Sequence, residues 1–275
     1  MINTALALAL PLVLSFAGQV GAVDTSAAPW VPRRSERADV PAGSELRVQW
    51  ETQANPSQRA LITVSVRLAA TVRLSIAFQP RSPSETPLAL PHWAQAQGAL
   101  AAINGGYFQS TFLPTGLVRG NGRELATFSQ NPLLSGCLVI DGNGHASLVH
   151  ATDAAVSTAP DALQSGPFLI DPGGSLGIRR HPDIPCAARS VIACSADGQL
   201  NLIVTSPVTL ADLSTALHDH PDAFGLSDVE RCLNLDGGPS TSLMIRGDRL
   251  QTGTARDVTV PVMLEVLPRI GPTRP

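Results

Sequence analysis

Much of the chain alternates between apolar and polar positions with the period of a β-strand. The first such runs lie at 46–50 and 62–68, and a third run at 72–78 follows directly after Ala69-Ala70. Alternation of this kind is typical of strands that bury one face. The close spacing of the second and third runs predicts an antiparallel pair that turns at the two alanines.

Two later pairs of apolar runs are separated by turn residues. The run at 138–140 leads into Asp141-Gly142-Asn143-Gly144, and the runs at 190–194 and 200–204 are separated by Asp197-Gly198. Asp-Gly and Asn-Gly favour tight turns because both residue types tolerate a positive φ. Each pair is therefore predicted to form a β-hairpin.

Helical signals are few and short. Residues 88–97 are predicted to form a helix that ends at Gly98. Leucines at helical spacing in 210–217 follow Thr209, which is a candidate N-cap. A further short helix is predicted at 227–231.

Strands therefore outnumber helices, and they occur both in hairpins and with helices between them. This combination predicts an α+β fold, a single domain of mixed, largely antiparallel β-sheets with a few short helices. No internal repeat of 20–50 residues is present.

The first 22 residues have the character of a leader. An apolar run from Ile2 to Ala22 is interrupted by Pro11 and ends in the small residues Val20-Gly21-Ala22. It predicts a signal peptide at 1–22, hence a secreted or periplasmic protein with no membrane span after cleavage. The run is preceded by no positive charge, so an uncleaved anchor stays open as the alternative.

Two further boundaries follow from composition. Residues 23–45 are rich in proline, arginine, serine and alanine and are predicted to be an exposed linker, and the domain is predicted to occupy 46–270.

The composition narrows the classes of protein and partner. The chain is 44% hydrophobic and 15% charged, which excludes disorder for its body. Its formal net charge of -3, with no basic block, argues against a nucleic-acid partner. No nucleotide-binding glycine loop and no CxxC pair are present, and the segment 238–242 lacks the last glycine of a nucleophile elbow. No cofactor is required by the sequence, and a divalent cation and the oligomeric state are left open.

Two loops carry most of the chemical information. Each follows an apolar run and begins with a polar residue and two glycines, as AINGGYF at 102–108 and LNLDGGPSTS at 233–242. Paired glycines allow close approach of the backbone and expose amides that can bind an anion. Either loop alone could be a tight turn in which Asn104 or Asp236 is only a turn former. Two such loops in one chain favour a site.

The two loops resemble the AINGGFF and LDGGGST motifs of the phosphodiester glycosidase family, with Pro239 in place of the third glycine. Residues 188–193 with the following Asp197-Gly198 resemble the family's Arg-Thr-Ala-Val-Gly strand and hairpin, and 256–262 resembles its closing Arg-Pro-Val segment. The order and spacing match from 60 to 267. The resemblance implies an exported hydrolase of sugar-1-phosphodiesters, with envelope or exopolysaccharide glycans as substrates.

Cleavage of such a substrate suggests roles for individual residues. Arg189 is the candidate for holding the phosphate, because a guanidinium matches two phosphate oxygens. Asp236 is the candidate acid, base or water-orienting group, and Asn104 is a neutral positioning partner. The residues expected to bind substrate are Gly105, Gly106, Tyr107, Gly237, Gly238, Ser240 and Thr241.

A second acid or base is not singled out. The candidates are Glu124, Asp171 and Asp257, and His181 is a further one in a proline-containing loop. The histidines and aspartates at 218–222 resemble a metal cluster, but their place at a helix end favours a polar C-terminus, and no metal site is predicted.

Export would permit disulfides among the four cysteines. Cys186 and Cys194 flank one predicted strand, which would separate them by roughly 25 Å, too far for a bond. Cys186 and Cys232 precede the site arginine and aspartate by three and four residues. If those residues meet on neighbouring strands, Cys186–Cys232 is the favoured pair, with Cys137 and Cys194 free or bonded.

The rival function is a non-catalytic module that binds envelope polysaccharide on the same fold. Its basis is three departures from the family motifs, Pro239 for glycine, Ser190 for threonine and Ala193 for glycine. Proline matters most, because it removes an amide donor and fixes φ.

Overall fold

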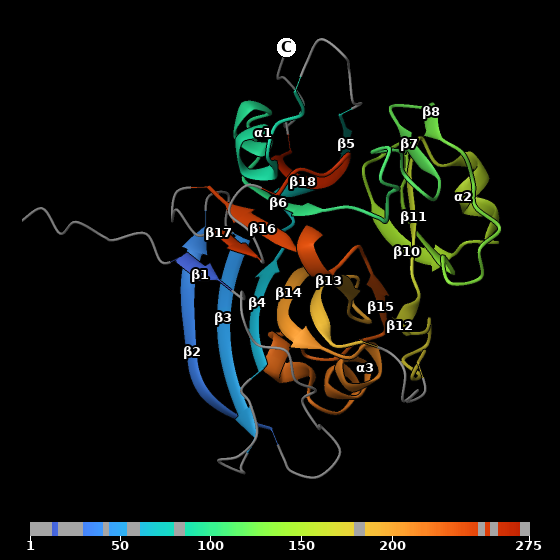
Figure 1. Ribbon diagram of the computed structural model, residues 1–275. Coiled ribbons are helices and arrows are strands. Elements are labelled where there is room, and N and C mark those ends of the chain that lie inside the picture. Colours follow the sequence, from blue (N-terminus) through green and yellow to red (C-terminus); the bar gives the residue numbers. More distant parts are fainter. Residues whose placement is uncertain are drawn as a thin grey trace, which may run out of the picture.

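The computed structural model describes residues 13–15, 30–40, 44–53, 61–79, 86–178, 185–246, 251–253 and 258–269, with side chains only beyond residue 60. Two large sheets pack face to face, and a helix covers the outer face of each (Figure 1). A smaller sheet forms a lobe beside them, drawn in green.

The larger sheet has seven strands, and all neighbours are antiparallel. Its order is β12 (Phe168–Ile170), β15 (Arg231–Asn234), β13 (Ala187–Cys194), β14 (Leu200–Val208), β4 (Leu61–Arg67), β3 (Ser44–Gln53) and β2 (Trp30–Val40).

The facing sheet has six strands, antiparallel except for the first pair. Its order is β1 (Val13–Ser15), β17 (Gln251–Gly253), β16 (Ser242–Ile245), β6 (Ala101–Asn104), β18 (Val262–Pro268) and β5 (Val72–Phe78).

The side lobe is an antiparallel sheet of five strands. Its order is β10 (Ala146–His150), β9 (Gly136–Ile140), β11 (Asp161–Ser165), β7 (Val118–Gly120) and β8 (Arg123–Ala126). Helix α2 (Ala154–Thr158) packs on β9 and β11 through Val156.

Alternation along the central strands produces the layers. In β13, Ile192 faces the core between the two large sheets, whereas Val191 faces α3 (Leu210–Asp219). In β6, Ile103 faces the same core and Ala102 faces α1 (Leu90–Ala96). Full burial of such an aliphatic side chain contributes about 1.5–3 kcal/mol to the free energy of folding. Alternate residues of each strand therefore stabilise its packing on the facing sheet and on the covering helix.

The α+β prediction is confirmed, as are the local signals that led to it. Gly98, at φ 77°, follows α1, and the Thr209 side chain accepts a hydrogen bond from the Asp212 amide at the start of α3. The turns at 141–144 and 197–198 join β9 to β10 and β13 to β14 as hairpins.

Two predictions are wrong, the pairing of the runs at 62–68 and 72–78 and the helix at 227–231. Strands β4 and β5 do not pair, because the chain crosses at Ala69-Ala70 from the seven-stranded to the six-stranded sheet. The helix expected at 227–231 does not form. Instead a 3-10 helix, η2 (Pro221–Phe224), ends at Gly225, and the Glu230 amide donates to the Cys194 carbonyl at the end of β13.

The segment 23–45, predicted to be an exposed linker, contains β2 and the first two residues of β3. Strand β2 pairs with β3 at ten positions. Most of the predicted signal peptide lies outside the described residues, apart from Val13–Ser15 in β1. No helix in the described part of the chain is long and apolar enough to span a membrane.

Candidate active site

The two glycine loops meet where β6 and β15 end. Asn104, the last residue of β6, is fully buried, and its Nδ2 donates to the main-chain oxygen of Asp236 at 2.7 Å. The Asp236 amide donates to the carbonyl of Gly105 at 3.0 Å. These two hydrogen bonds hold the loops side by side, as the motif pair led us to expect.

The same asparagine also contacts two other strands. Its Oδ1 accepts from the Ser190 hydroxyl of β13 at 2.6 Å and from the Ser242 amide of β16 at 3.1 Å. Ser190 and Ser242 are both buried. Asn104 therefore connects β6 with β13, the second loop and β16, and its amide has no surface left for a ligand.

Three of the motif glycines lie where a side chain would collide. A Cβ on Gly105 would lie 2.7 Å from Val262, and one on Gly237 would lie 2.8 Å from the Ala188 carbonyl oxygen. A Cβ on Gly106 would lie 3.0 Å from the Gln164 carbonyl oxygen. Gly238 differs, since its φ of 57° rather than crowding favours glycine. The first three glycines thus permit close packing of the two loops against β18, β11 and β13.

Asp236 is the carboxylate at this meeting point. It is half-buried, its Oδ1 accepts from the Gly237 amide at 2.9 Å, and the Ser240 hydroxyl donates to it. Burial raises the pKa of Asp236, and the two hydrogen bonds oppose the rise. A carboxyl with a raised pKa that is still reached by solvent can exchange a proton with a ligand.

Arg189 passes beside the second loop. A Cβ on Gly237 would lie 3.7 Å from its Cδ, and its Nε and Nη2 donate to the carbonyls of Val208 and Pro185 at 3.1 and 2.7 Å. The side chain is 8% exposed, and burial lowers the pKa of its guanidinium. An arginine remains charged under such conditions, so it supplies a fixed positive charge.

Tyr107 interacts electrostatically with both of these charged residues. Its hydroxyl donates to the Gly166 carbonyl at 2.9 Å and accepts from Asn234 Nδ2 at 2.5 Å. Burial, followed by the charge of Asp236, raises the pKa of Tyr107 to about 12, and Arg189 opposes the rise. The phenol is thus neutral near pH 7 and lies within the electrostatic range of both groups.

Both hydroxyl residues of the second motif are buried. Ser240 donates to the Asp236 carboxyl. Thr241 is fully buried, so it offers no surface for its expected contact with substrate.

The sequence analysis missed three polar residues of this network, Ser190, Asn234 and Ser242. The first was noted only as a departure from a motif. Their signal was present, because each is a polar residue within an apolar strand or at its end. Such residues need partners when buried.

The other candidate acids and bases lie elsewhere or beyond the described residues. Glu124, on β8, forms an ion pair with Arg119 at 3.7 Å, and Asp171 follows β12 beside the start of β15, at the opposite end from Asp236. Asp257 and His181 lie outside the described residues.

The expected polar helix end at 218–222 is consistent with the contact of His218 Nδ1 and Asp219 Oδ1 at 2.7 Å. Within the described residues, no group of three or more His, Cys, Asp or Glu side chains could hold a metal ion.

The Cys186–Cys232 disulfide expected from the sequence is absent, and all four cysteines are thiols. The spacing argument required β13 and β15 to run in the same direction, but they are antiparallel. Cys232 therefore pairs with Ala193, near the far end of β13 from Cys186.

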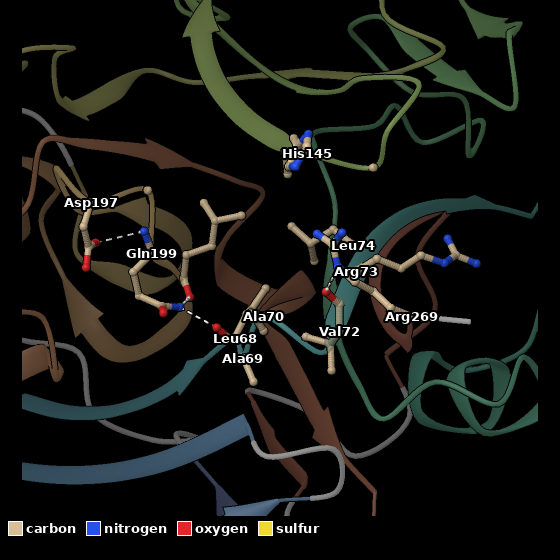
Figure 2. Close-up of a pocket in the computed structure, with 14 residues that line it drawn as sticks. Leu68, Ala69, Ala70, Val72, Arg73, Leu74, His145, Asp197, Gln199 and Arg269 are labelled. Carbon is tan, nitrogen blue, oxygen red and sulfur yellow. Dashed lines mark hydrogen bonds between the residues drawn. The ribbon is translucent and has the colours of Figure 1, made fainter. Parts of the chain in front are cut away.

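Of two cavities in the structure, one adjoins this site and the other lies away from it. One, of about 600 Å³, is lined by Tyr107 and Gly166. The other, of about 290 Å³, lies among the turns around Ala70, His145 and Asp197 (Figure 2). Arg189 lies near the start of β13 and Asp197 follows its end, so the length of this strand separates the second cavity from the motif residues.

The protein shares its fold with solved structures of low sequence identity. A hypothetical protein from Synechocystis matches with a TM-score of 0.64 and 16% identity, over 86% of this chain and 64% of that protein. The catalytic domain of zebrafish N-acetylglucosamine-1-phosphodiester α-N-acetylglucosaminidase matches with a TM-score of 0.59 and 16% identity, over 87% of this chain and 89% of that domain.

A protein from Burkholderia pseudomallei described as exported matches with a TM-score of 0.54 and 13% identity, over 80% of this chain and 74% of that protein. No curated protein matches the sequence. The phosphodiester glycosidase family model matches residues 97–266, a segment that contains both glycine loops and Arg189. The chain therefore belongs to the phosphodiester glycosidase family.

Proposed function

We propose that this protein is an exported hydrolase that cleaves sugar-1-phosphodiesters of envelope or exopolysaccharide glycans. The observation that carries the proposal is the convergence of Asp236, Arg189 and Tyr107 around the two glycine loops. A phosphodiester needs a positive charge for its phosphate and a proton donor for the departing oxygen, and these residues supply both kinds of group.

The reaction adds water across the bond between sugar and phosphate or between phosphate and aglycone. Arg189 supplies the positive charge for the phosphate, and Tyr107 keeps its proton and its hydrogen bond to the Gly166 carbonyl. Asp236 moves the proton, either to the leaving oxygen or from the attacking water. Asn104 does not touch the substrate but positions the loop that carries Asp236.

Purified protein incubated with UDP-sugars and p-nitrophenyl sugar phosphodiesters tests this proposal. Release of the free sugar or the sugar phosphate is expected for at least one substrate, and the product also identifies the bond that is cleaved. The proposal is overturned if no member of a broad panel is hydrolysed by the folded protein.

A binding module is the second candidate, favoured by Pro239, which removes one amide donor from the second loop. Such a module would bind a sugar phosphodiester without turnover in both the wild-type protein and the Asp236→Asn variant. An enzyme would lose turnover in that variant and keep its affinity for the ligand.

Export is proposed from the leader at 1–22. N-terminal sequencing of protein recovered outside the cytoplasm is expected to begin after Ala22. A protein retained in the membrane with residues 1–22 intact would support the anchor instead.

A further inference from the structure

We propose that the cavity beside Tyr107 binds the aglycone, and that the aglycone is an apolar aliphatic or aromatic group esterified to the phosphate. This inference rests on the proposed function, since it names the substrate class for the same site. The cavity holds about 600 Å³, within the range of roughly 300–1,000 Å³ that is usual for small-ligand sites.

The lining residues are mainly apolar, and none of those described is charged. The apolar ones are Leu133, Leu134, Pro167, Ile178 and Leu210. Burial of a sugar against such walls would strip water from hydroxyls that find no partner there, which is unfavourable. Burial of an alkyl or aryl group removes apolar area from water and is favourable.

Several polar atoms of the cavity residues are already bonded within the protein. The Gly166 carbonyl accepts from the Tyr107 hydroxyl and from Asn234 Nδ2, at 2.9 and 3.1 Å. Asn131 Oδ1 accepts from the Leu133 amide at 3.0 Å. Hydrogen-bonding capacity is thus partly used up, so the cavity recognises shape and apolar surface.

Tyr107 connects the cavity with the charged groups. It lines the cavity, and its hydroxyl lies in the electrostatic field of Asp236 and Arg189. An ester whose phosphate lies at Arg189 would therefore place its alcohol part in the neighbouring cavity, which Tyr107 also lines. The 64% exposure of Leu133 provides apolar surface at the solvent side of the cavity.

The test compares n-octyl phosphate, below its micelle concentration, with methyl phosphate by isothermal titration calorimetry. Octyl phosphate is expected to bind at least about tenfold more tightly, because seven further methylenes leave water. Leu133→Asn should weaken octyl phosphate at least about threefold and leave methyl phosphate unchanged. Leu88→Asn is the matched control, since Leu88 is also exposed, at 47%, but lies before α1.

Equal affinities for the two phosphates in the wild-type protein would overturn the inference. Equal loss of octyl phosphate binding in Leu133→Asn and Leu88→Asn would do the same. Ile178→Asn gives a second readout on another wall of the cavity, and circular dichroism confirms that each variant is folded.

The turnover assay separates this inference from the proposed function. The proposed function stands and the aglycone preference fails if a sugar methyl phosphodiester is hydrolysed as fast as its octyl counterpart and the two phosphates bind with equal affinity. The apolar site stands and the proposed function fails if the protein binds octyl phosphate selectively but hydrolyses no phosphodiester.

Discussion

The two glycine loops have the same sequence pattern but hold their polar residues in opposite settings. Asn104 is fully buried, and both polar atoms of its amide bond to the protein. Asp236 is half-buried, and burial raises its pKa. A strand followed by two glycines thus determines where a side chain points, whereas the surrounding layers determine whether solvent reaches it. The first loop is a tether, and the second presents the carboxyl that we propose to be reactive.

The largest expected effect is that of removing the Asp236 carboxyl, the proposed reactive group. Asp236→Asn should lower kcat by about 10²–10⁴-fold, the range usual for loss of a general acid or base. Its melting temperature should fall little, since the amide keeps the size of the carboxyl. Kinetics on the best phosphodiester and thermal melts measure both quantities.

Asp171→Asn is the control for that variant, because Asp171 also follows a strand and is half-buried but lies at the other end of β15. It should leave kcat within about twofold, since it lies away from the site. If both variants lost the same activity, the second loop would not be the reactive one.

Removal of the tether should act on stability first. Asn104→Ala leaves the Ser190 hydroxyl, the Ser242 amide and the Asp236 carbonyl without their partner, all buried or half-buried. We expect a loss of about 3 kcal/mol in the free energy of unfolding. Urea denaturation measures it, with the exposed turn residue Asn143→Ala as a control that should change less than about 0.5 kcal/mol. A stable but inactive Asn104→Ala protein would contradict the tether role.

The glycines should show a smaller and more local effect. Gly105→Ala and Gly237→Ala introduce a Cβ only 2.7 and 2.8 Å from neighbouring atoms. Each should destabilise the protein by about 1–3 kcal/mol, the usual cost of overpacking. Gly142→Ala is the control, since a Cβ there meets nothing within 4 Å. Similar melting temperatures for all three variants would mean that the close approach to Val262 and Ala188 does not require glycine.

The smallest expected effect is a pH dependence of stability. Because the folded pKa of Asp236 is raised above its ordinary value of 3.8, the folded state favours the protonated carboxyl. This contribution is present below that value and is lost as pH rises through the folded pKa. The melting temperature of Asp236→Asn relative to wild type should therefore rise between pH 3.5 and pH 7. A constant difference across that range would indicate an unshifted pKa.

Local signals predicted local structure well, because caps and turns depend on a few adjacent residues. The Thr209 cap and the Asp141 and Asp197 turns are examples. The meeting of Asn104 with Asp236 was also predictable, from the paired motifs. The exchange of sheets at Ala69-Ala70 was not, because two strands of one sheet and strands of two facing sheets show the same alternation.

The disulfide failed for a related reason. The number of residues between two positions does not tell whether two strands are parallel or antiparallel. It could therefore not reveal that β13 and β15 run in opposite directions. The exposure of Asp236 and the burial of Thr241 could not be predicted from the sequence either, since both depend on how segments from distant parts of the chain pack.

The hydrogen bonds of Asn104 have a consequence for the order of folding. They span 86, 132 and 138 residues of sequence, and the bond to Ser190 joins the six-stranded sheet to the seven-stranded one. Contacts of such long range form slowly, because the entropy of loop closure must be overcome before they are made. During refolding, strand and helix signals therefore return before the two loops meet, and the geometry around Asp236 is among the last features to be completed. A chain that is still assembling its sheets therefore has no formed site.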